Sequence, residues 1–118
     1  MANPNILLAN NIYGKTALMA PTTTLSNVLV NSAGSGQILK LNSVTYANYE
    51  ANNVPIWVTF NRGTTPYYLA GSVTVPGYST LVVVAKDTSI YLEEGDYLKC
   101  NVGSQANCSV VVSYELIE

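Results

Sequence analysis

The sequence of 118 residues predicts an all-β protein: a single-domain antiparallel β-sandwich, jelly-roll-like, with an extended N-terminal arm. Runs of β-branched and aromatic residues are broken about every 8–12 residues by Gly, Pro, Asn, Ser or Asp, which is typical of a sandwich or barrel. Several of these runs alternate apolar and polar residues, as strands with one buried face do. No stretch repeats its apolar residues with the period of a helix.

The chain is expected to form one domain, because about 100–150 residues is the commonest domain size. We divide it into an N-terminal arm with the first strand, residues 1–24, and a β-sandwich domain, residues 25–118. The expected strands, in chain order, are residues 12–19, 25–31, 37–47, 54–61, 66–75, 79–86, 88–92, 96–102 and 107–117.

Residues 1–24 differ in composition from the rest of the chain, because they are rich in Asn and Thr and carry one charge, Lys15. Two interpretations are open for this segment. It is either a frayed terminus followed by a first strand, or an extended arm that adds itself to the sheet edge of a neighbouring subunit.

Two of the later strands alternate cleanly, residues 96–102 and 107–117, and each therefore has one buried face. By contrast, Leu81 to Ala85 is apolar on both faces. It is either a central strand or a strand whose outer face meets another subunit. The second alternative agrees better with the scarcity of charge and places Val82, Val84 and Val111 on outer faces.

Turn residues support these strand boundaries. Residues 61–66 contain a Gly and a Pro between two strands, and residues 31–36 form a Gly- and Ser-rich connection. Residues 75–78 are a candidate type II turn with Pro76 and Gly77 in the central positions. In residues 93–96, Gly95 is expected in the left-handed conformation of a hairpin.

The composition excludes several classes of function. Only 10% of the residues are charged, the net charge is −2 and histidine is absent, whereas an ordinary soluble domain is about 25% charged. Five basic residues are too few for a nucleic-acid surface. Neither a membrane-spanning run nor a secretory signal is recognisable, so we expect a chain made without export in a reducing compartment. A surface so poor in charge is expected to be covered by other subunits.

Cys100 and Cys108 share the face of their strands that also carries Leu98 and Val110. If Gly103 to Gln105 formed the loop, Val102 would pair with Ala106 and the two cysteines would lie directly opposite each other. Two interpretations are therefore open: small apolar thiols in the core or a cross-strand disulfide. A metal or catalytic role is disfavoured because no histidine or third thiol completes a site.

No cofactor, metal or catalytic residue is expected, and the protein is not expected to be an enzyme. Glu93, Glu94 and Asp96 crowd one turn and offer oxygens of the kind that Ca²⁺ binds, but their spacing matches no known calcium loop. Without histidine, no general base is available to activate a serine or cysteine nucleophile.

The candidate functional residues are therefore interface residues. Tyrosine supplies large contact area at low entropic cost and is enriched at interfaces, although sugar stacking would use the same side chains. The candidate interface residues are Ile6, Leu7, Leu8, Tyr13, Trp57, Tyr67, Tyr68, Tyr78, Val82, Val84 and Val111.

The segment Lys86-Asp87-Thr88-Ser89-Ile90-Tyr91-Leu92-Glu93-Glu94-Gly95-Asp96-Tyr97-Leu98 and the ending Val112-Ser113-Tyr114-Glu115-Leu116-Ile117 resemble small virion structural proteins of tailed bacteriophages, among them cyanophages and other phages of aquatic bacteria. The resemblance implies a β-sandwich on the particle exterior, as a head decoration (cement), neck or collar, or fibre-associated protein. Its implied partners are copies of itself, as a trimer or ring, and other virion proteins such as the major capsid or neck proteins. The implied location is the virion, assembled in the host cytoplasm.

The leading hypothesis is thus a non-enzymatic virion protein that decorates or cements the capsid or seals the neck or tail region. The alternative is a receptor- or carbohydrate-binding module at a fibre tip, which predicts an exposed cluster of Trp57 or of Tyr67 and Tyr68. A third hypothesis, a bacterial adhesin or pilus-like subunit, is weaker because it requires export.

Overall fold

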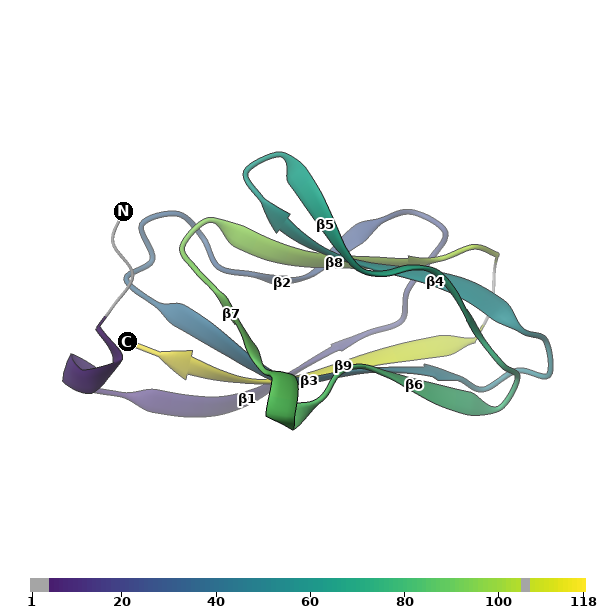
Figure 1. The fold of residues 1–118 in the computed structure, drawn as a ribbon, viewed down its shortest axis with the longest axis horizontal. Helices are drawn as coiled ribbons and strands as arrows, with labels where there is room; N and C mark the ends of the chain where they lie inside the picture. Colours follow the sequence, from purple (N-terminus) through teal and green to yellow (C-terminus); the bar gives the residue numbers. More distant parts are fainter. Residues whose placement is uncertain (1–4, 105–106) are drawn as a thin grey trace.

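The computed structural model describes residues 5–104 and 107–118, and within them the chain forms two antiparallel sheets packed face to face (Figure 1). The predicted fold class, an all-β antiparallel sandwich, is confirmed. The body measures 48 × 26 × 20 Å. The strands are β1 (Ile12–Met19), β2 (Ser26–Val30), β3 (Ile38–Asn48), β4 (Val54–Arg62), β5 (Thr65–Val75), β6 (Ser79–Val84), β7 (Ile90–Leu92), β8 (Asp96–Val102) and β9 (Cys108–Ile117), with short 3₁₀ turns η1 (Ile6–Leu8) and η2 (Lys86–Thr88).

The five-stranded sheet has the order β1-β9-β3-β6, and β7 pairs with the other half of the long strand β3. The four-stranded sheet has the order β2-β8-β4-β5. Consecutive strands mostly alternate between the two sheets, and β4 and β5 are joined as a hairpin. The strand positions expected from the sequence agree with the structure to within two residues at nearly every end, because alternation and turn residues are local signals.

The core lies between the sheets and is built from the inward-facing residue of each alternating pair. Leu41 and Val112 from one sheet and Ile56 and Leu98 from the other are completely buried. Tyr46 is also completely buried, and its hydroxyl donates a hydrogen bond of 2.9 Å to the carbonyl of Asn101 in the opposite sheet. Burial raises the pKa of this hydroxyl above its ordinary value. The tyrosine thus links the two apolar faces through a buried hydrogen bond.

The cysteines lie in this core as free thiols, so the core-thiol interpretation is confirmed. The expected pairing of Cys100 opposite Cys108 is wrong, because β8 and β9 belong to different sheets: β8 pairs with β2 and β4, and β9 with β1 and β3. The Cys100 thiol instead lies 3.4 Å from the sulfur of Met19. Gln105 of the expected loop and Ala106, the expected partner of Val102, lie outside the described residues.

Strand β6 is an edge strand, so the interpretation of Leu81 to Ala85 as a central strand is wrong. Its pairing with β3 shifts between Thr45, opposite Val82, and Val44, opposite Val84. A bulge of this kind turns the following side chain to the other face. Val82 is therefore 55% exposed, whereas Val84, expected on the outer face, is 4% exposed and part of the core.

Two of the expected turns differ in detail. Gly95 has the expected positive φ of 91°, but its turn is not a hairpin, because β7 and β8 lie in different sheets. The turn after β5 is shifted by one residue: Ser79 donates to the carbonyl of Pro76, and Tyr78 rather than Gly77 has the positive φ, of 57°. A Cβ atom at Gly77 would lie 2.1 Å from the Ala51 carbonyl oxygen, so the glycine is required there for close approach.

Strand β1 pairs with β9 of the same chain along its whole length, from Ile12 opposite Ile117 to Met19 opposite Val110. The first strand of the N-terminal segment is thus part of the five-stranded sheet. The division of the chain into residues 1–24 and 25–118 remains a prediction.

Candidate assembly surface

Among residues 5–104 and 107–118, the free edge of β1 is the least protected sheet edge. Within those residues β1 pairs only with β9, is eight residues long, and contains neither a proline nor a register shift. Its one charged residue is Lys15. Soluble proteins normally protect such an edge with charges, prolines, bulges or very short strands, because an open edge pairs with other chains.

The other edge strands carry no charged residue, unlike β1, but they are interrupted or shorter. Strands β2, β6 and β7 have five, six and three residues, and none of these residues is charged. The long edge strand β5 contains Pro66, two register shifts against β4, and Ser72 with a positive φ of 53°. The β1 edge therefore offers the longest regular run of backbone groups for pairing.

A row of uncharged side chains crosses the outer face of the five-stranded sheet, from the β1 edge to the β6 edge. We define the apolar row as Leu18, Val111, Thr45 and Val82, which lie opposite one another on β1, β9, β3 and β6. The exposed fractions of Leu18, Val111 and Val82 are 74%, 36% and 55%.

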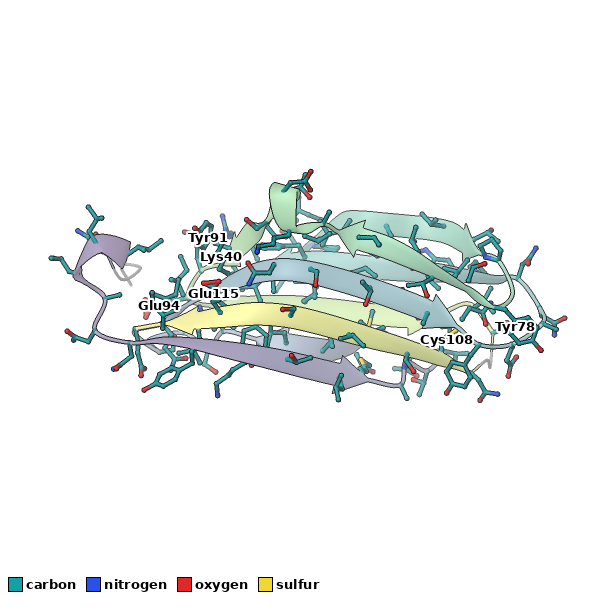
Figure 2. The ribbon with its side chains drawn as sticks, turned by 90° about the horizontal axis from the view of Figure 1, so that it is seen from below. Lys40, Tyr78, Tyr91, Glu94, Cys108 and Glu115 are labelled. Carbon is teal, nitrogen blue, oxygen red and sulfur yellow. The ribbon has the colours of Figure 1, made fainter. Side chains whose placement is uncertain are left out.

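The charged side chains of this sheet lie toward one end. Figure 2 shows Lys40, Glu94 and Glu115 in the half of the molecule nearer to η1, and Tyr78 and Cys108 at the opposite end. The half that carries the apolar row thus combines exposed aliphatic groups with small hydroxyl groups, a surface suited to a protein contact rather than to solvent.

The N-terminal turn, which we define as Ile6 to Leu8 in η1, is a second exposed apolar group. Leu7 is 92% exposed and Leu8 76% exposed. The turn is closed by the side chain of Asn5, which accepts a hydrogen bond of 3.0 Å from the Leu7 amide. It precedes β1 and projects from one end of the sandwich (Figure 1).

The aromatic candidates do not gather in one place. Tyr13, 46% exposed, lies opposite Leu116 on β9, and Tyr78 lies in the turn before β6. Tyr67 and Tyr68 are neighbours in β5 and therefore point to opposite faces. Tyr67 lines a small hollow with Phe60 and Arg62, and Trp57 is half-buried. Tyr67 and Tyr68 are 59% and 63% exposed, and a sugar-binding role of these residues or of Trp57 stays a prediction.

Arg62 is a structural residue that the sequence analysis did not single out. Its guanidinium donates to both carboxylate oxygens of Asp96, at 2.9 and 2.7 Å, also pairs with Glu93, and lies over the ring of Phe60. The hydrogen bond to Asp96 is the first cause of a raised pKa of Arg62. Asp96 also accepts from the Glu93 amide. Since strand register brings Arg62 to Asp96, no local pattern could have revealed the pair.

Carboxylate oxygens of the acidic turn thus accept hydrogen bonds from groups of the protein itself. Asp96 is bonded as above, and Glu94 accepts from the Gly36 amide at 2.7 Å. In the described part of the chain, no three metal-ligating side chains gather into a group. The same residues include no helix long and apolar enough to cross a membrane.

No protein-family model matches the chain, and no curated protein is similar to it. A solved structure described as "Bacillus endospore appendages form a novel family of disulfide-linked pili" contains a similar chain, with a TM-score of 0.51 and 12% sequence identity. The similarity covers 99% of this chain and 95% of that chain. At this identity the similarity shows a shared β-rich fold and no more.

Proposed function

We propose that the chain is a non-enzymatic structural subunit that assembles with copies of itself. The observation that carries the proposal is the uncovered apolar row beside the unprotected edge of β1. A monomer with this surface in water would expose aliphatic groups and unpaired strand backbone on the same side. Further copies that pair with the edge and pack over the face would cover both, and symmetric assembly is the usual arrangement of such copies.

The shared fold supports the proposal, because the solved neighbour is described as forming pili. That description includes disulfide links, which the two cysteines of this chain are not placed to form between subunits. Cys100 is 0% exposed and Cys108 is 2% exposed, so neither thiol reaches a neighbouring subunit while the sandwich is intact. The proposed assembly of this chain therefore uses no disulfide through Cys100 or Cys108.

In its finer form the proposal places the subunit on a bacteriophage virion, where it decorates or cements the capsid or seals the neck or tail region. The resemblance of residues 86–98 and 112–117 to phage structural proteins supports this form. Its partners are then copies of itself and the major capsid or neck proteins. Its location is the virion, after assembly in the host cytoplasm.

The test is the molar mass of the purified chain in solution, measured by light scattering over a range of concentrations, with electron microscopy of any large species. We expect oligomers or fibres for the natural sequence. The double substitution Val82→Lys and Val111→Lys places two charges in the apolar row and should weaken association at least tenfold. Val30, 47% exposed on β2 of the other sheet, provides the matched control Val30→Lys. A chain that stays monomeric near 1 mM would overturn the proposal.

A further inference from the structure

The two ends of the five-stranded sheet differ in shape and in exposed apolar groups. One end carries the projecting N-terminal turn, in which Leu7 is 92% and Leu8 76% exposed. The other end has an open hollow of about 370 Å³. In Figure 2 the turn lies at one end of the sheet and Cys108, next to the hollow, at the other. The hollow is lined by Leu18, Met19, Ala20, Ser109, Val110 and Val111.

The chemistry of the hollow matches that of the turn. None of its lining residues is charged, and its walls are mainly aliphatic. The hollow is open to solvent, and bulky apolar side chains that entered it would displace water from its walls. Displacement of water from such walls by leucine is favourable because both surfaces leave water together.

The turn cannot fill the hollow of its own chain. The amides of Asn10 and Asn11 donate to the Glu118 carbonyl at 2.8 and 3.1 Å, and the Glu118 amide donates to Asn11 at 3.0 Å. These bonds tie the turn to the end of the sheet where β1 begins. The hollow lies where β1 ends, eight residues further on, or about 26 Å at the usual rise of a strand.

We propose that the N-terminal turn of one copy docks in the hollow of a second copy, so that copies join head to tail. This inference rests on the proposed self-assembly and names one contact of it. If two copies docked reciprocally, turn to hollow and hollow to turn, they would close as a two-fold dimer. Copies that join head to tail in one direction each leave a turn or a hollow for the next copy, and they form a closed ring or an open filament.

The experiment uses the full-length chain with two added cysteines, Leu7→Cys in the turn and Leu18→Cys in the hollow, treated with a short bismaleimide cross-linker. Both positions are exposed, at 92% and 74%, so the substitutions should leave the fold intact. We expect a ladder of dimers, trimers and longer species on a denaturing gel. An equal mixture of the two single-cysteine chains should stop at dimers.

The natural chain is the control for reaction of the two buried cysteines. The matched control variant carries Leu7→Cys and Val30→Cys, so that its second added cysteine lies on the other sheet. Light scattering on the same samples separates the two proposals. Oligomers that give no ladder would overturn the head-to-tail contact and leave self-assembly standing, whereas a monomeric chain would overturn both. A cross-link within one chain, seen as a faster monomer band, would also overturn the docking.

Discussion

Cys100 shows how strongly the core controls the chemistry of one residue. Its thiol is completely buried between the sheets, beside the sulfur of Met19. Burial raises its pKa to about 12, whereas an unfolded chain has a cysteine pKa of about 8.5. Burial also raises the pKa of Cys108, with the charge of Glu50 as the second cause. The reactive thiolate is therefore suppressed in the folded protein, which agrees with an assembly that uses no disulfide through these cysteines.

This difference predicts a loss of stability in alkali. Because the folded pKa of Cys100 lies above the unfolded one, its contribution is complete below about pH 8.5 and is lost as the pH rises toward about 12. In that window the unfolded chain has lost the Cys100 proton and the folded chain still holds it, so the free energy of unfolding falls by about 1.4 kcal/mol for each pH unit. Urea unfolding of the natural chain and of Cys100→Ala between pH 7 and 11 measures it. The variant should lose less stability with pH, and equal slopes would contradict the assignment.

At the scale of the elements, strand positions were predictable and sheet membership was not. Alternation located β8 and β9 because each side chain reports its own face. Nothing local showed that these consecutive strands lie in different sheets, since that depends on pairing with β4 and β3, far away in sequence. The burial of Val84 was missed for a related reason, because a bulge reverses the alternation. For the interface, exposed candidates such as Leu7 and Val82 were predictable, and their arrangement in space was not.

Connections between the sheets depend on buried asparagines. Asn48, 2% exposed at the end of β3, donates to the carbonyl of Asn52 at 2.8 Å and of Val75 at 3.2 Å, and accepts from the Glu50 amide. It thereby fixes the crossing from β5 to β6.

Because Asn48→Ala leaves these buried groups without partners, the substitution should lower the free energy of unfolding by about 2–3 kcal/mol. Asn27→Ala, at an exposed position of β2, should cost less than about 0.5 kcal/mol in the same urea titration. Equal costs would contradict the role of Asn48.

At the scale of the whole molecule, the scarcity of charge determines how assembly should respond to the solvent. The chain has 12 charged residues from five basic and seven acidic side chains, and Arg62, Glu93 and Asp96 are used within the fold. The apolar row and the N-terminal turn contain none. In the proposed assembly, ion pairs between copies would therefore contribute little, and apolar burial and uncharged hydrogen bonds would dominate the contact.

Assembly should consequently persist in high salt and weaken in the cold. Raising NaCl from 0.05 to 1 M shortens the screening length from above 10 Å to about 3 Å, yet the association constant should change by less than about threefold. Sodium sulfate should strengthen association, because this salt strengthens apolar burial. Cooling from 25 to 4 °C should weaken association, because apolar burial is less favourable in the cold. Sedimentation velocity at fixed protein concentration measures all three effects. A tenfold loss of association in 1 M NaCl would show that charged pairs join the copies, and would contradict an apolar interface at the β1 edge.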